Sequence, residues 1–332
     1  KIKKSKLSNF KNKLDFWATN SEEGGWNISS TDEGSQKMLE NENEKQIKIQ
    51  TGTEVVDDFV IEEETSDDER MIVNMGPQHP STHGVLRLQA ELEGEVVRRV
   101  KPIIGYLHTG MEKTGEELNY FQGPTNTTRM DYLSPLFNEL VFSLTTEKLI
   151  GIEVPKRAET IRILMTELNR VSSHLVALAT GGMDIGALSM MIFGFREREL
   201  ILNFFEKTTG LRMNHNFIRP GGVAADLPDG WQKDVEEILK VIPEKLQDYD
   251  DMLLDNPIWK GRLQNVGILS TEECFAYGIT GPSLRASGYS WDLRKSQPYS
   301  GIENYDFDVP ILNEGDVFAR WRVKVLEIFE SL

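Results

Sequence analysis

The sequence of 332 residues is 39% hydrophobic, which is enough apolar content to bury a sizeable core. Its 37 basic and 53 acidic residues give a net charge of −16, which disfavours nucleic-acid binding because a phosphate backbone requires a cationic face. No apolar run is long enough to cross a bilayer, and the single cysteine, Cys274, excludes an internal disulfide framework and cannot hold an iron–sulfur cluster alone. We therefore expect a protein of a reducing compartment that reaches any membrane through partners.

Residues 1–70 do not have the composition of a packed core. Residues 1–14 carry six lysines and no acid, and residues 54–69 carry nine acids and no base. The apolar centre of a secretory signal is missing, and the acids that follow suit no transit peptide. We predict an extended, partly disordered arm against a neighbouring subunit, with simple disorder as the alternative.

Two histidines, His79 and His83, follow in a stretch held in a loop by Gly and Pro. Pro80 lies between them and argues against a continuous helix, so they are not the helical metal pair that their spacing suggests. Apolar and polar residues then alternate over 85–93, and a turn at Gly94 leads into 96–100, which predicts two antiparallel strands holding the histidine loop at one edge. Residues 103–113 are interpreted as a buried strand that runs into a loop.

From residue 131 onward, apolar residues recur every three or four positions, which predicts amphipathic helices. The first begins just after Tyr132, and the second starts near Pro155 and ends at Gly181 and Gly182. Asp184 opens the third, which ends by Gly210. The predicted apolar face of this third helix consists of Ile185, Leu188, Ile192 and Phe195. We expect the second and third helices in the core of a bundle.

The remaining sequence predicts two more helices separated by a loop region. Residues 231–253 form a long helix with a kink at Pro243, and residues 261–310, rich in Gly, Ser, Pro and Tyr, form a long ordered loop. Asp316 caps a final amphipathic helix, and because no Gly or Pro terminator follows it we expect the native chain to continue. No Walker-type loop or dinucleotide glycine fingerprint occurs, so nucleotide binding by this chain is not expected.

Each candidate site residue also has an ordinary structural explanation. His79 and His83 suit bonds to buried carbonyl groups in their loop, and we interpret His79 in this way. Tyr132 suits a core aromatic whose hydroxyl is hydrogen-bonded. Asp184, which follows two glycines, suits an N-cap, a role that competes with proton transfer.

Six motifs in order, between about residue 71 and residue 332, resemble one family. They are 76–84 (GPQHPSTHG), 106–113 (YLHTGMEK), 129–132 (RMDY), 195–199 (FRERE), 218–223 (IRPGGV) and 284–288 (LRASG). Together they resemble the D-type subunit of NADH-quinone oxidoreductase, which is the hydrogenase-derived 49 kDa subunit of respiratory complex I. Residues 1–70 lie outside this resemblance.

The resemblance implies an α+β fold: a mainly α-helical bundle core of the nickel–iron hydrogenase large-subunit type, with a small N-terminal antiparallel β-hairpin or sheet. We expect a small β-rich subdomain with loops at 71–130 and a helical core at 131–332, with the C-terminal part of the family missing. In the hydrogenases two Cys-x-x-Cys pairs hold the metals, whereas the matching position here has Asp131 and Ser134 in place of the first pair. Hard oxygen ligands do not replace thiolates at a soft metal centre, so the resemblance implies no metal and no cofactor bound by this chain, and a pocket reused for a quinone headgroup.

The resemblance also implies roles for particular residues. His83 and Tyr132 match the side chains that hydrogen-bond the quinone carbonyls, and both groups can donate a proton. Asp184 matches a carboxylate that pairs with the imidazole of His83 and reloads it with a proton. Thr180 matches a residue that lines the quinone pocket, and Arg129 matches an arginine close to the terminal 4Fe-4S cluster of an adjacent subunit, where a cation stabilises the reduced cluster.

Two positions depart from the family pattern. Thr109 stands where many members have an arginine, so a role that depends on that charge lapses. Asn214 stands where several members have a histidine that titrates with the cluster. The histidine here is His215, one position later, and because adjacent residues point in different directions we assign it no such role.

The function expected from the resemblance is that of a subunit of a proton-pumping NADH or ferredoxin:quinone oxidoreductase, not active alone, that forms part of the quinone-binding site. Expected partners are the cluster-bearing B-type subunit, the C-type subunit and the membrane-arm H- and A-type subunits. The expected location is the cytoplasmic side of a bacterial inner membrane, with the matrix side of the mitochondrial inner membrane or the thylakoid as alternatives. Two other functions are considered: a non-catalytic scaffold that docks a redox partner to a membrane module, and a nickel–iron hydrogenase large subunit, against which the single cysteine argues.

Overall fold

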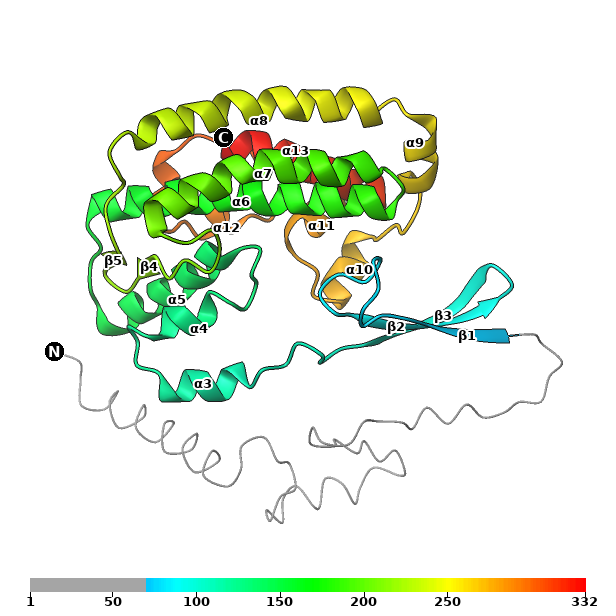
Figure 1. The fold of residues 1–332 in the computed structure, drawn as a ribbon, viewed down its shortest axis with the longest axis horizontal. Helices are drawn as coiled ribbons and strands as arrows, with labels where there is room; N and C mark the ends of the chain where they lie inside the picture. Colours follow the sequence, from blue (N-terminus) through cyan, green and yellow to red (C-terminus); the bar gives the residue numbers. More distant parts are fainter. Residues whose placement is uncertain (1–69) are drawn as a thin grey trace, which may run out of the picture. The chain divides into compact units, whose positions relative to one another are not determined.

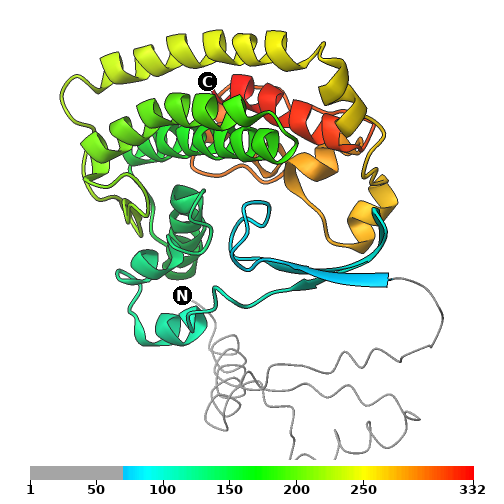
Figure 2. The ribbon, with the colours of Figure 1, turned by 45° about the vertical axis from the view of Figure 1, so that its right-hand side comes forward.

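A computed structural model describes residues 70–332, so the predicted N-terminal arm lies outside the described residues. The described part begins with a three-stranded sheet in the order β1 (Arg70–Met75), β2 (Arg87–Glu93), β3 (Val96–Ile103). β2 and β3 are antiparallel, with Arg87 opposite Ile103 and Glu93 opposite Val96, and Gly94 takes a positive φ in the turn between them. The predicted hairpin is therefore confirmed. The loop between β1 and β2 projects from the sheet toward the helical body (Figure 2).

The segment after β3 differs from the prediction. Ile104, which was expected in a buried strand, is 84% exposed, and β3 ends one residue before it. Gly105 follows with φ +121°, which turns the chain out of the sheet. Two short helices that the sequence did not reveal come next, α3 (Met111–Glu117) and α4 (Gly123–Thr127). Two neighbouring isoleucines favour extended backbone, but burial requires a packing partner that this segment does not have within the described chain.

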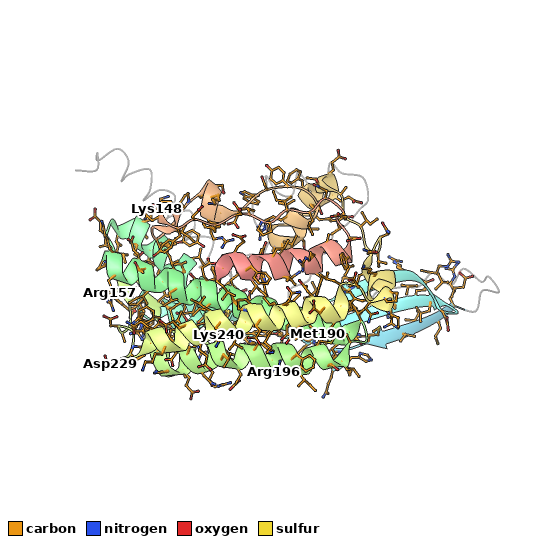
Figure 3. The ribbon with its side chains drawn as sticks, turned by 90° about the horizontal axis from the view of Figure 1, so that it is seen from above. Lys148, Arg157, Met190, Arg196, Asp229 and Lys240 are labelled. Atoms are coloured by element: carbon orange, nitrogen blue, oxygen red, sulfur yellow. The ribbon has the colours of Figure 1, made fainter. Side chains whose placement is uncertain are left out.

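Long helices form the rest of the body, as predicted. α6 (Lys156–Asp184), α7 (Leu188–Thr209), α8 (Trp231–Leu253) and α13 (Val317–Ser331) run alongside one another (Figures 1 and 2). Seen from above, α8, which carries Lys240, lies between α13 and the helix that carries Arg196 (Figure 3). α5 (Pro135–Ile150) lies beside α4. A second, two-stranded antiparallel sheet pairs β4 (Ile218–Arg219) with β5 (Gly222–Val223). A mainly helical body with small antiparallel sheets confirms the predicted α+β fold class. None of the helices in residues 70–332 is long and apolar enough to cross a membrane.

α6 continues through its two glycines, whereas the sequence predicted its end there. Gly182 remains helical, and a β-carbon placed on it would lie 2.7 Å from Cβ of Met190. The glycine therefore permits close packing of α7 rather than ending α6. Asp184 becomes the last residue of α6, and the N-cap of α7 is Ala187, so the interpretation of Asp184 as an N-cap is wrong.

The buried face of α7 is also not the predicted one. Leu188 and Ile192 are 68% and 70% exposed, and Phe195 is 38% exposed. The opposite side contains Gly194, where a β-carbon would lie 2.7 Å from Cβ of Ala179 on α6. Both sides of α7 are apolar, and the side with the smallest residue packs on α6 because the two backbones can approach there most closely.

Short helices replace much of the predicted loop at 261–310. They are α9 (Pro257–Leu263), α10 (Thr271–Ala276), α11 (Gly281–Ala286), α12 (Leu293–Ser296) and the 3₁₀ helix η1 (Ile302–Asn304). Helices this short do not show apolar periodicity, which explains why the sequence did not predict them. The last helix agrees with expectation: Asp316 Oδ1 accepts a hydrogen bond from the N–H of Ala319 at 2.7 Å and caps α13.

Candidate functional site

The loop between β1 and β2 presents His83 and uses His79 to hold its own shape. His79 Nδ1 accepts the N–H of Ser81 at 3.1 Å, and its carbonyl oxygen accepts the N–H of Thr82 at 3.1 Å. Thr82 is buried, whereas His83 is exposed. A β-carbon on Gly76 would lie 2.0 Å from the carbonyl oxygen of Leu86, so only glycine closes this loop. The described hydrogen bonds of His79 are therefore with donor groups of its own loop and not with the buried carbonyl groups that the sequence suggested.

His83 meets the C-terminal end of α6. Its Nε2 lies 3.2 Å and 3.0 Å from the two carboxylate oxygens of Asp184. Because a carboxylate only accepts, Nε2 carries the proton in this contact, which leaves Nδ1 free to face another group. The side chains are 46% and 33% exposed, so the pair stands at the surface.

Thr180 lies one turn before Asp184 on α6 and is partly buried. Its hydroxyl donates to the carbonyl oxygen of Val176 at 2.8 Å, the usual back-bond of threonine within a helix. Residues four apart share a helix face, so Thr180 extends the same side of α6 that carries Asp184.

Tyr132 comes from the loop between α4 and α5, and that loop is fixed from two sides. Asn169 of α6 donates to the carbonyl oxygen of Leu133 at 3.0 Å, and Asn138 of α5 donates to that of Asp131 at 2.9 Å. The hydroxyl of Tyr132 then lies against the histidine loop: a β-carbon built on Gly84 would be 3.5 Å from it. Tyr132 is 42% exposed, so part of its side chain is accessible from outside.

Three of the predicted residues therefore gather from three separate elements: His83, Tyr132 and Asp184. The cluster offers an imidazole N–H and, against the same loop, a phenolic O–H, with a carboxylate behind the imidazole. Two such donors suit a small molecule with two oxygen acceptors. Two cavities, of about 170 and 200 Å³, lie elsewhere, between α7 and α8 and between α6 and the start of α8.

Arg129 lies on the loop that carries Tyr132 but at its other end. It is exposed, and its guanidinium folds back to donate to the carbonyl oxygen of Thr125 in α4. Asp131 and Ser134 of the same loop are engaged with neighbours: Asp131 Oδ1 accepts the N–H of Leu133 at 3.1 Å, and the hydroxyl of Ser134 lies 3.4 Å from that of Ser173. Within residues 70–332 no group of three or more His, Cys, Asp or Glu side chains is arranged to hold a metal ion.

Sequence reasoning missed the groups that hold the segment after α7. Glu139 and Glu147 of α5 are almost completely buried, and their carboxylates accept backbone N–H groups of residues 216–221. No periodic signal could reveal them, because their polar side faces the interior of the molecule. The only indication in the sequence was the motif at 218–223, the segment whose N–H groups these carboxylates accept.

His215 precedes this segment and is buried against Phe205. The two rings pack edge to face, with their centroids 4.9 Å apart. Its Nε2–H donates to the carbonyl oxygen of Arg212 at 3.1 Å, and burial lowers its pKa to about 4. His215 is therefore neutral at pH 7. Asn214 takes φ +54° in the turn before it, and Thr109 is exposed.

Comparison with known proteins gives one consistent result. The family of the 49 kDa subunit of the respiratory-chain NADH dehydrogenase matches residues 184–332. The D-type subunit of NADH-quinone oxidoreductase from Salinispora arenicola is 58% identical over 267 residues, which cover 80% of this chain and 60% of that protein. The same subunit from Rhodococcus jostii is 58% identical over 80% of this chain and 61% of its own length, and that from Mycobacteroides abscessus is 55% identical over 86% and 67%. The chain thus spans about 60% of the length of most of these relatives.

Proposed function

Because this chain belongs to the family of the 49 kDa, D-type subunit of NADH-quinone oxidoreductase, we propose that it forms one wall of a quinone-reduction site in a proton-pumping respiratory complex. In this proposal the chain is a peripheral subunit on the cytoplasmic side of a bacterial inner membrane. Its partners are a B-type subunit that carries the terminal 4Fe-4S cluster, a C-type subunit and the membrane-arm H- and A-type subunits. NADH or ferredoxin is the electron donor, and both act through other chains.

The observation that carries the proposal is the contact of His83 with Asp184, in the loop against which the hydroxyl of Tyr132 lies. Reduction of a quinone to a quinol takes two electrons and two protons, one at each carbonyl oxygen. The electrons arrive from the partner subunit's cluster. The phenol of Tyr132 donates a proton to one oxygen, and the protonated imidazole of His83 donates its Nδ1 proton to the other. The Nε2–H group of His83 remains hydrogen-bonded to Asp184 throughout.

The exposure of all three side chains also supports the proposal. These side chains are open to solvent on this chain, and in the proposal a partner subunit covers them. The partner then excludes water from the site once the complex is assembled. Arg129, at the other end of the Tyr132 loop, is exposed as well and is available to the partner subunit's cluster.

The test uses three variants of the assembled complex. Tyr132→Phe and His83→Ala each remove one proton donor, and we expect quinone reduction to fall at least about 100-fold. Asp184→Asn still accepts from Nε2–H but loses the charge, so we expect about a tenfold loss. Electron transfer to artificial acceptors upstream of the quinone stays intact in all three.

His108→Ala is the control, because it removes an exposed histidine that lies outside the three elements that carry His83, Tyr132 and Asp184. Quinone turnover at the level of the unchanged complex in both Tyr132→Phe and His83→Ala would refute the proposal.

A further inference from the structure

Glu139 on α5 is a buried carboxylate with an unusual number of partners. Its exposed fraction is 0%, and each oxygen accepts two hydrogen bonds. Oε1 accepts from the hydroxyl of Thr128 and from the N–H of Asn216, both at 2.6 Å, and Oε2 accepts from the N–H groups of Phe217 and Ile218 at 2.8 and 2.9 Å. A buried charge is expensive, so four donors converging on one carboxylate indicate that the segments they come from must be held in place.

A second buried carboxylate holds the continuation of the same segment. Glu147, two turns further along α5, accepts the N–H of Gly221 at 2.7 Å and pairs with the fully buried Arg162. Arg162 also donates to the carbonyl oxygens of Arg219 at 2.8 Å and Gly222 at 2.9 Å. The segment from 216 to 222 is thus fixed along its inner side, while the side chain of Arg219 remains exposed.

Two arginines, Arg129 and Arg219, lie close in the sequence to the groups that the two carboxylates hold. Arg129 follows Thr128 directly, and Arg219 lies in the held segment, with its Nε donating to the carbonyl oxygen of Asn216 at 3.0 Å. Both are exposed. Since Thr128 and Asn216 bond to the same oxygen of Glu139, the two backbones that carry these arginines lie beside each other. Both cations lie on a chain whose net charge is −16.

We infer that Glu139 is a positioning residue that holds Arg129 and Arg219 together toward one neighbour, an electron carrier whose negative charge increases on reduction. The inference rests on the proposed function, which places Arg129 beside the partner subunit's cluster, and it adds Arg219 and the carboxylate behind both. Each cation stabilises the reduced carrier and raises its potential, and because the interaction falls with distance, the effect depends on how firmly the guanidinium groups are held.

The test measures the midpoint potential of the partner subunit's cluster in the assembled complex, by redox titration followed by electron paramagnetic resonance. Arg129→Gln and Arg219→Gln set the reference and are expected to make the potential more negative. Glu139→Gln keeps the shape of the side chain but has one acceptor oxygen for four donors, so the two backbones separate. It is expected to shift the potential in the same direction as the arginine variants.

Combination of the variants distinguishes positioning from a general structural effect. If Glu139 acts through the arginines, adding Glu139→Gln to the Arg129→Gln/Arg219→Gln double variant produces no further shift. Thr128→Val is the milder variant, since it removes only the hydroxyl that joins the Arg129 loop to Glu139, and Thr128→Ser restores that hydroxyl and the potential. Asp250→Asn, which disrupts a buried carboxylate paired with Arg322 on α13, is the matched control and leaves the potential unchanged.

The outcomes separate this inference from the proposed function. A cluster potential unaffected by Glu139→Gln and Thr128→Val, in complexes where the arginine variants lower it, overturns the inference and leaves the quinone site standing. If neither arginine variant shifts the potential while Tyr132→Phe still abolishes quinone reduction, the inference fails and the quinone site again stands. Where Glu139→Gln does not assemble, Thr128→Val decides.

Discussion

At the scale of single residues, His215 couples protonation to the stability of the fold. It is 4% exposed, its one hydrogen bond is to the carbonyl oxygen of Arg212, and its Nδ1 is buried without a partner among the described residues. Burial therefore lowers its pKa to about 4, from the ordinary value of 6.5. The folded state holds the neutral imidazole, whereas the unfolded chain takes up a proton below pH 6.5.

The contribution of His215 to stability is fully present above pH 6.5 and is lost progressively as the pH falls from 6.5 to about 4, by about 3 kcal/mol in total. His215→Gln does not titrate and keeps a donor for Arg212. We expect its free energy of unfolding to fall less steeply between pH 7 and pH 4 in urea titrations. Parallel curves for the two proteins would contradict this.

The family resemblance, and not residue types alone, indicated the members of the candidate site, and it did not show their contacts. The sequence indicated that His83, Tyr132 and Asp184 match a quinone site, and the structure brings the three together. The motif could not show that Nε2 of His83 faces the carboxylate. That assignment depends on where the end of α6 lies relative to a loop 101 residues earlier in the chain.

At the scale of elements, the packing of α7 on α6 depends on Gly194. A β-carbon there would lie 2.7 Å from Cβ of Ala179 and 3.0 Å from the carbonyl oxygen of Leu175. We expect Gly194→Ala to lower the free energy of unfolding by about 1–3 kcal/mol, because the helices must separate, although alanine is the better helix former. Chemical denaturation measures this change.

Gly261, in α9, provides the matched control. It is also helical, but a β-carbon on it would meet nothing within 4 Å. Gly261→Ala is therefore expected to stabilise the protein by about 0.5–1 kcal/mol through helix propensity alone. If both substitutions stabilised the protein equally, close contact between α6 and α7 would not be the reason for Gly194.

α5 shows why some functional groups are invisible to pattern analysis. Its apolar residues predicted a helix after Tyr132, and the helix is present. Glu139 and Glu147, however, read as solvent-facing positions in the sequence, because acidic side chains are mostly exposed. Only the tertiary structure, which supplies four backbone N–H groups and Arg162 as partners, makes their burial possible.

At the scale of the whole molecule, three separate elements bring their site residues to one exposed place: the β1–β2 loop with His83, the end of α6 with Asp184, and the loop of Tyr132. A scaffold without catalytic function would not need the hydroxyl of Tyr132 to lie against the loop of His83. We expect a photoreactive quinone analogue to label residues 76–84 or 129–134 in the assembled complex, and excess quinone to suppress this labelling.

α8 (Trp231–Leu253) provides the internal control for this experiment, because it lies across the bundle from that exposed place and is expected to remain unlabelled (Figure 1). Labelling that is confined to other chains of the complex would favour the scaffold.

The sequence by itself determined the elements whose signals are local. The β2–β3 hairpin, α6, α8 and the Asp316 cap of α13 follow from alternation, helical period and capping chemistry in neighbouring residues. The tertiary structure alone decided which face of α7 is buried, that α6 runs on to Asp184, and that one oxygen of Glu139 joins Thr128 to Asn216. These features depend on contacts between residues far apart in the chain, which form only where packing brings them together.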